Sequence, residues 1–280
     1  GWMLHYFYLT ATGKFTGLDA DQVGGVFNEM LSQPLVMAFW MIVVVAIGIF
    51  VCSRGLQNGL EKITKVMMIA LLAIMVVLAI NSIMMDGAAE GLKFYLIPDF
   101  ERMKELGIGY TIVTAMNQAF FTLSLGIGAM AIFGSYIGKE RSLLGESANI
   151  AILDTFVAIV SGLIIFPACF TFGVSPTSGP SLIFITLPNI FNHIPMGRLW
   201  GSLFFIFMTF AAFSTVLAVF ENIISCMMEL TGWSRKKSSL VNLFGIILLS
   251  LPCVLGYNVW SWDGFSIFGG AVLDLSLIHI

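Results

Sequence analysis

The polarity pattern of the chain consists of long apolar runs separated by short polar stretches. Residues 35–52 and 66–85 carry no charged side chain. Because a helix needs about 20 apolar residues to cross the roughly 30 Å hydrocarbon core of a bilayer, runs of this length indicate membrane-spanning helices. The polar stretches 13–33 and 86–105 are predicted to be connecting segments. The predicted spans are residues 1–12 (the second half of a span), 34–52, 62–85, 108–137, 147–172, 199–229 and 238–256.

The uncharged stretch 106–138 is too long for one straight helix. At 1.5 Å per residue it would be about 50 Å long, well over the thickness of the hydrocarbon core. Thr122 and Ser124 are followed closely by Gly126 and Gly128. We therefore predict a helix interrupted at residues 124–128 whose backbone groups face a ligand, because lipid cannot satisfy them. A glycine kink in an ordinary span is the alternative.

Composition supports a membrane protein independently of the pattern. Apolar residues make up 58% of the chain, charged residues 10%, and the mean hydropathy is +0.96. A soluble globule of this size is excluded, because too few polar side chains exist to cover its surface. The net charge of -3 and the short basic cluster 235–237 give no reason to propose nucleic acid as a partner. The four cysteines lie in or beside apolar runs, where they are expected to pack as small residues rather than to form disulfides or bind metal.

The basic residues predict the orientation in the cell membrane. Eight of the 13 Lys and Arg residues belong to one set of alternate connecting segments and five to the other. The positive-inside rule then places loops 53–61, 138–146 and 232–237 in the cytoplasm. Loop 173–198, which holds four of the eight prolines, is predicted to be an ordered outer loop that could include a short helix dipping toward the membrane.

Two acidic residues fall inside predicted spans. A charge at membrane depth costs at least ~2.5 kcal/mol on insertion scales, so Asp154 should have a partner such as a cation or a proton. The alternative is a position near the cytoplasmic end of its span, where the carboxylate reaches water. Glu221 could be a structural hydrogen-bond partner or a proton carrier.

Several motifs follow one another in the order of a known family. The segment N-Q-A-F-F-T-L-S-L-G-I-G at residues 117–128 resembles the sixth transmembrane helix of the neurotransmitter:sodium symporters, a family of sodium-coupled amino-acid transporters. Further matches are R-G-L-Q-N-G-L-E-K-I-T-K at 54–65, L-I-P-D-F-E at 96–101, S-G-P-S-L-I-F-I-T-L-P at 178–188 and F-A-A-F-S-T at 210–215. The resemblance implies an all-α membrane protein with the broken-helix, inverted-repeat (LeuT-like) transporter bundle. The bundle would be incomplete, from the end of helix 3 to the start of helix 10 of the family.

The resemblance also implies binding residues. The first sodium site would use Thr122 and Asp154, the latter standing where the family usually has an asparagine. The second would use the backbone carbonyl of Ala211 and the hydroxyls of Ser214 and Thr215, although such hydroxyls usually bond back to a carbonyl one turn earlier. The apolar members of the implied substrate pocket could equally be ordinary packing residues of a bundle. That pocket comprises Phe121, Thr122, Ser124, Ile127, Thr215 and Val219.

Chloride is not expected to be required. Gln118 matches a glutamine near the chloride site of chloride-dependent members, but Ala158 stands where those members carry a serine. Asp154 could supply the missing negative charge. Gln118, Asp154 and Glu221 are therefore the candidate residues for linkage to an anion or a proton.

The function implied by the resemblance is sodium-coupled symport of a small neutral, hydrophobic amino acid by alternating access. Sodium ions at two sites would be the cofactors, and the amino acid and the lipid bilayer the partners; the oligomeric state is left open. A sodium-dependent receptor or a channel on the same scaffold is the alternative. An enzyme is disfavoured, because no His or Cys pair accompanies Asp154 or Glu221. The family's first and second helices have no counterpart here, so this fragment alone is expected not to transport, and the native origin of residues 276–280 is left open.

Overall fold

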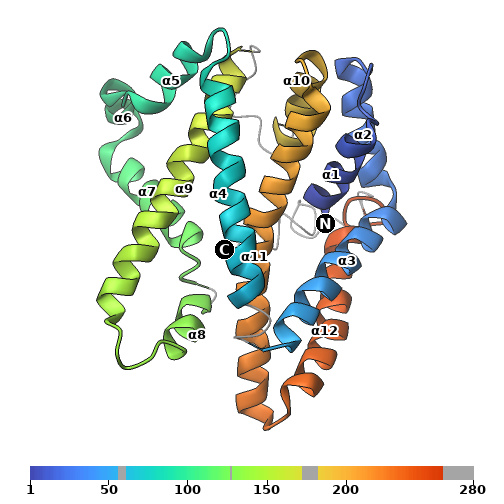
Figure 1. Cartoon of the computed structure of the whole chain (residues 1–280), viewed down its shortest axis with the longest axis vertical. Helices are drawn as coiled ribbons and strands as arrows, with labels where there is room; N and C mark the ends of the chain where they lie inside the picture. Colours follow the sequence, from blue (N-terminus) through green and yellow to red (C-terminus); the bar gives the residue numbers. More distant parts are fainter. Residues whose placement is uncertain (56–60, 127, 172–181, 261–280) are drawn as a thin grey trace. The chain divides into compact units, whose positions relative to one another are not determined.

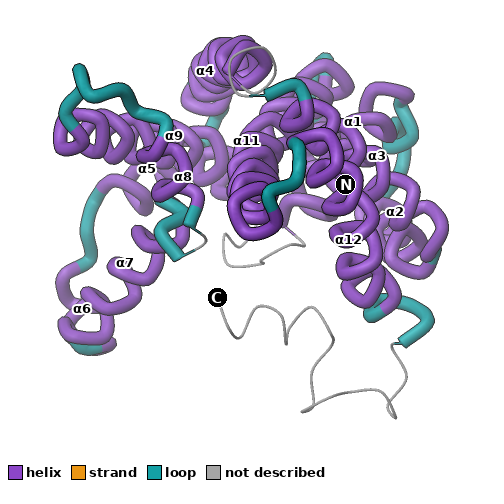
Figure 2. Tube along the Cα trace, turned by 90° about the horizontal axis from the view of Figure 1, so that it is seen from below, coloured by secondary structure: helices purple, strands orange, loops and turns teal. Residues whose placement is uncertain are grey.

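The computed structural model describes residues 1–55, 61–126, 128–171 and 182–260, which are helical and contain no strand (Figure 1, Figure 2). The chain divides into two compact units. The first unit is Gly1–Ile69 with Ser178–Ile280, and the second is Ala70–Thr177. Five helices of the described part are long and apolar enough to cross a membrane, as expected of a multi-pass membrane protein. They are α3 (Pro34–Ser53), α4 (Glu61–Ile83), α9 (Leu143–Thr171), α11 (Gly197–Thr231) and α12 (Arg235–Leu255).

Helix α11 is the centre of the first unit. It packs against α1 (Trp2–Thr12), α3, α10 (Leu187–His193) and α12, and α3 also packs along α12 (Figure 1). The side chains of Tyr6 and Phe205 are fully buried between these helices, with ring centroids 5.3 Å apart. Phe184 lies against Tyr6 at 4.9 Å. This aromatic cluster joins η2 (Leu182–Thr186) and α1 to the central helix. Because η2 and α10 lie within the predicted loop 173–198, the second half of that loop is helical.

The polar stretch 13–33 is not a simple connector, because it contains α2 (Ala20–Ser32). Its N-terminus is a capping box in which Asp19 accepts a hydrogen bond from the Gln22 N–H at 2.8 Å and the Gln22 side chain accepts one from the Asp19 N–H. Val23, Phe27 and Met30 are buried on one face. The spacing of four and three residues is that of an amphipathic helix, and it outweighs the polar composition of the stretch.

The charged stretch 86–105 likewise forms helices rather than a loop. These are α5 (Ala88–Leu96) and α6 (Phe100–Leu106), the latter capped by Asp99. Helix α5 packs along α9 in the second unit. A methyl group added at Gly91 would come within 2.6 Å of the Phe166 carbonyl oxygen, so glycine is required for this close approach. Helix α9 begins at Leu143, inside the predicted loop 138–146, where the Ser142 hydroxyl accepts the Gly145 N–H at 3.5 Å.

The predicted interruption of the 106–138 stretch is confirmed. Helix α7 (Ile108–Thr122) ends and α8 (Ala129–Ser135) begins seven residues later, so the stretch is broken and not merely kinked. Ser124 has a left-handed φ of 54°, which is uncommon for a residue with a side chain. The Leu125 N–H donates to the Phe120 carbonyl and the Ser124 N–H to the Phe121 carbonyl, which is the Schellman pattern of a helix end.

Candidate functional site

The second unit brings together the two residues predicted for the first sodium site. Thr122 is the last residue of α7, and Asp154 lies on α9. The Thr122 hydroxyl donates a hydrogen bond to Oδ1 of Asp154 at 3.2 Å, although 31 residues separate them in the chain. A carboxylate and a hydroxyl oxygen at this separation are the hard ligands that alkali and alkaline-earth cations prefer, so this pair fits a sodium ion.

The break after α7 determines which backbone groups lie beside this pair. The helix stops at Thr122, so carbonyls of its last turn have no partner within a continuing helix. The Schellman bonds occupy the carbonyls of Phe120 and Phe121, which come before Thr122 in the chain. A hydroxyl and the polar end of a helix are thereby placed next to the Asp154 carboxylate.

Residues flanking the pair lie on the same two helices. Gln118 is one helical turn before Thr122 on α7, and Ala158 is one turn after Asp154 on α9; both are exposed in the described part of the chain. Phe121 has 62% of its surface exposed, and Ser124 lies in the break. Ile127 lies outside the described residues.

The residues predicted for the second sodium site share one stretch of α11. The Ser214 hydroxyl donates to the Ala211 carbonyl at 2.8 Å, which is the back-bond that adjacent hydroxyls commonly make. Thr215 follows directly, and Val219 is one turn further along. Phe121, Thr122 and Ser124 belong to the second unit, whereas Thr215 and Val219 belong to the first, so their grouping in one substrate pocket stays a prediction.

Comparisons with known proteins agree on one family. The family described as "Sodium:neurotransmitter symporter family" matches residues 25–268. The chain belongs to this family. An uncharacterized sodium-dependent transporter of Bacillus subtilis, YhdH, is 34% identical over 99% of the chain and 60% of its own length. Another from Haemophilus influenzae is 30% identical over 98% of the chain and 60% of its length.

A solved structure supports the fold of this family. The crystal structure of MhsT in complex with L-phenylalanine is 36% identical and superposes with a TM-score of 0.85, covering 98% of this chain and 61% of that one. The predicted broken-helix transporter fold, incomplete in this chain, is thereby confirmed. The chain spans about 60% of the length of these relatives. The Bacillus subtilis and Haemophilus influenzae relatives are transporters by name, and with the family match they confirm the prediction that the chain is not an enzyme.

Glu221 has an ionic partner that the sequence reasoning missed. Its side chain is fully buried, and Arg235 contacts it with two hydrogen bonds, one to Oε1 at 2.8 Å and one to Oε2 at 2.9 Å. Arg235 also donates to the carbonyl of Cys52 at 3.0 Å, so it links the ends of α3 and α12 to the middle of α11. The signal was available, because a buried acid needs a partner and Arg235 is the first basic residue after Glu221 in the sequence.

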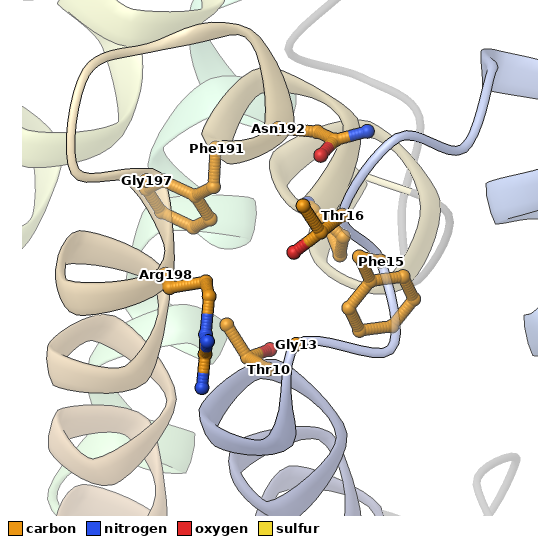
Figure 3. Close-up of a pocket in the computed structure, with 9 residues that line it drawn as sticks. Thr10, Gly13, Phe15, Thr16, Phe191, Asn192, Gly197 and Arg198 are labelled. Carbon is orange, nitrogen blue, oxygen red and sulfur yellow. The ribbon is translucent and has the colours of Figure 1, made fainter.

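A small hollow in the first unit contains none of the predicted site residues (Figure 3). Its volume of about 20 Å³ is enough for roughly one water molecule. Figure 3 shows Arg198 beside Thr10 and Gly13, with the Thr16 hydroxyl across the hollow. Arg198 donates to the carbonyl of Ala11, in the last turn of α1. A cation there stabilises the end of that helix, so the arginine has a structural role.

Proposed function

We propose that the protein containing this chain carries out sodium-driven symport of a small neutral, hydrophobic amino acid by alternating access. The observation that carries the proposal is the 3.2 Å contact between the Thr122 hydroxyl and the Asp154 carboxylate at the break between α7 and α8. Membership of a sodium symporter family supports the sodium part. The relative MhsT, solved with L-phenylalanine, supports an amino acid as substrate.

The first sodium ion would lie between Thr122 and Asp154. The hydroxyl now donates a hydrogen bond to the carboxylate, and rotation of that O–H would direct a lone pair to the ion instead. Asp154 would add a negative charge that the usual asparagine lacks. Asp154 forms no ion pair with a basic side chain among the described residues.

The second sodium ion would be held by α11. Ser214 Oγ and the Ala211 carbonyl oxygen already lie 2.8 Å apart, and Thr215 would add a second hydroxyl. These three oxygen atoms are neutral ligands, so this site would depend more on the number of ligands than on charge.

The substrate would occupy the pocket predicted at Phe121, Ser124, Ile127, Thr215 and Val219. Apolar side chains there would favour an aliphatic or aromatic amino acid through burial of apolar surface. The hydroxyls and the exposed backbone of the broken helix would orient its polar groups. Segments of the longer protein outside this chain would complete the pocket.

Ion replacement tests the proposal. Uptake of labelled L-leucine and L-phenylalanine by cells producing the full-length parent should fall to background when choline replaces sodium, because the ion gradient drives the substrate. Sodium-dependent binding without uptake would favour the receptor alternative, and currents far above the coupled flux a channel. Uptake that persists in choline would exclude the sodium symporter.

The orientation is a separate proposal with its own test. The excess of Lys and Arg puts loops 53–61, 138–146 and 232–237 in the cytoplasm of a cell-membrane protein. In a cysteine-free parent, a cysteine replacing the exposed Lys104 should react with an impermeant thiol reagent added outside intact cells. A cysteine replacing the exposed Lys139 should react only after the cells are opened. The opposite labelling pattern would show that the chain is inverted.

A further inference from the structure

Helix α5 approaches the helix that carries Asp154 unusually closely. Gly91 of α5 and Gly162 of α9 both face backbone or ring atoms of the other helix. A methyl group added at Gly162 would overlap the ring of Tyr95, and one added at Gly91 would meet the backbone of Phe166 and Pro167. The two glycines therefore let a side chain of α5 reach the α9 backbone itself.

Tyr95 is the side chain that makes this contact. Its hydroxyl donates toward the carbonyl oxygens of Ala158 at 3.4 Å and Ile159 at 3.3 Å, which share its single proton. Its ring is stacked on Phe166, with centroids 4.7 Å apart and planes 20° from parallel. Ring and hydroxyl together fix the side chain along about two turns of α9.

The contacted carbonyls lie one turn beyond the candidate sodium ligand. In an α-helix the N–H of Ala158 bonds to the carbonyl of Asp154, so Ala158 is held by Asp154 through its N–H and by Tyr95 through its carbonyl. Thr122 of α7 contacts the same region of α9 through its hydrogen bond to the Asp154 carboxylate. Tyr95 and Thr122 thus both act on α9 within about one turn of Asp154.

A second hydroxyl donor contacts α9 farther from Asp154. Pro167 lies inside the helix and cannot donate to the carbonyl of residue 163, so one backbone hydrogen bond of α9 is missing there. Ser82 of α4 donates to the nearby Ile164 carbonyl at 2.6 Å, ten residues after Asp154. The carbonyls that Tyr95 contacts come only four and five residues after Asp154, so Tyr95 is better placed than Ser82 to fix the turn that holds the carboxylate.

We infer that Tyr95 is a positioning residue for the first sodium site, fixing the turn of α9 that holds Asp154 against Thr122. The inference rests on the proposed sodium symport, because it assigns a role toward the same site. It extends the site to α5, an element outside the helices that supply its ligands. Sodium affinity should therefore depend on a hydroxyl that does not touch the ion.

Sodium alone is the probe in the test. The purified full-length parent is heated in mixtures of sodium and choline chloride at constant ionic strength, and the sodium concentration that gives half of the maximum thermal stabilisation is recorded. Tyr95→Phe keeps the ring on Phe166 and beside Gly162 but removes the donor. We expect it to raise this midpoint about two- to tenfold, the range for losing one hydrogen bond.

Two matched variants separate positioning from general loosening. Ser82→Ala removes a hydroxyl donor to the same helix farther from Asp154, and Tyr110→Phe removes an exposed tyrosine hydroxyl on α7. Both should leave the sodium midpoint within about twofold of the parent's, a change below one typical hydrogen bond. An equal rise in Ser82→Ala and Tyr95→Phe would overturn the inference.

The remaining outcomes are decisive as well. An unchanged midpoint in Tyr95→Phe, or a Tyr95→Phe protein that no longer folds, would assign Tyr95 to packing and overturn its positioning role. If the unmodified parent shows no sodium stabilisation, the proposed symport fails first. If sodium stabilises the parent and the Tyr95→Phe variant with the same midpoint, only the inference about Tyr95 is contradicted.

Discussion

The pair formed by Glu221 and Arg235 shows how a single acid is accommodated in the middle of an apolar helix. The Glu221 side chain is 0% exposed, and that of Arg235 is 23% exposed. Burying a carboxylate costs several kcal/mol, and the cost is offset only when a counter-ion and further hydrogen bonds accompany it. The two bonds from Arg235, with a longer contact from Ser225 at 3.4 Å, provide that compensation. Glu221 therefore reads as a structural partner of α12 in this conformation.

Removing the arginine alone should be more harmful than removing the pair. Arg235→Met leaves the buried Glu221 carboxylate without its counter-ion, and we expect a loss of about 3–5 kcal/mol in the free energy of unfolding. Glu221→Leu combined with Arg235→Met should recover most of that loss, because an apolar pair has no charge to desolvate. Denaturant unfolding of the purified full-length parent in detergent measures both.

Lys236→Met is the control for this experiment, since Lys236 is exposed and adjacent to Arg235. It should change the stability by no more than about 0.5 kcal/mol, as surface substitutions usually do. If Arg235→Met is as stable as Lys236→Met, the ion pair contributes nothing to the folded state.

At the scale of the element, apolar run length decided what could be predicted. The long helices could be predicted because their residues are apolar on every side, so the length of the apolar run identifies them without any periodicity. They are α3, α4, α9, α11 and α12. The break after α7 was also predicted, because small and polar residues interrupt an otherwise uncharged stretch. Its end at Thr122 could not be predicted. It depends on the left-handed backbone of Ser124, a conformation that usually indicates a glycine, and residue 124 is not one.

The short helices were missed for a physical reason. Helices α2, α5 and α6 are amphipathic or polar and lie in stretches whose composition favours loops. The capping box at Asp19 and the buried spacing of Val23, Phe27 and Met30 were readable signals for α2. For α5 the decisive contact is tertiary, since Gly91 and Tyr95 matter only once α9 lies against them.

The candidate site shows the same limit. Asp154 was identifiable from the cost of a charge at membrane depth, and the family resemblance named Thr122. Their contact joins two helices that are far apart in the sequence, so no local pattern could place them together. Arg235 was counted only as a loop charge, although it is the first basic residue after Glu221 and so was an available candidate for its partner.

At the scale of the whole molecule, the charges that cross the membrane together must be balanced. The proposed cargo is two sodium ions and a neutral amino acid. The two ions give this cargo a net positive charge, which must pass through a medium of low dielectric. Glu221 is already neutralised by Arg235, so it has little charge left for an ion. Asp154 contacts the neutral Thr122 hydroxyl and has no basic partner among the described residues, so its negative charge is available.

Transport by the full-length parent should therefore not require chloride. In chloride-dependent relatives a bound anion offsets the sodium charge, but here an anion beside the Asp154 carboxylate would be repelled. Uptake of labelled L-leucine and L-phenylalanine should be equal in sodium chloride and sodium gluconate. Asp154→Asn combined with Ala158→Ser, which removes the fixed charge and restores the hydroxyl, should make uptake several-fold greater in chloride than in gluconate. Ala158→Ser alone keeps the carboxylate and should stay indifferent to chloride. If the unmodified parent already loses most of its uptake in gluconate, Asp154 does not compensate the sodium charge, and an anion site elsewhere in the protein must do so.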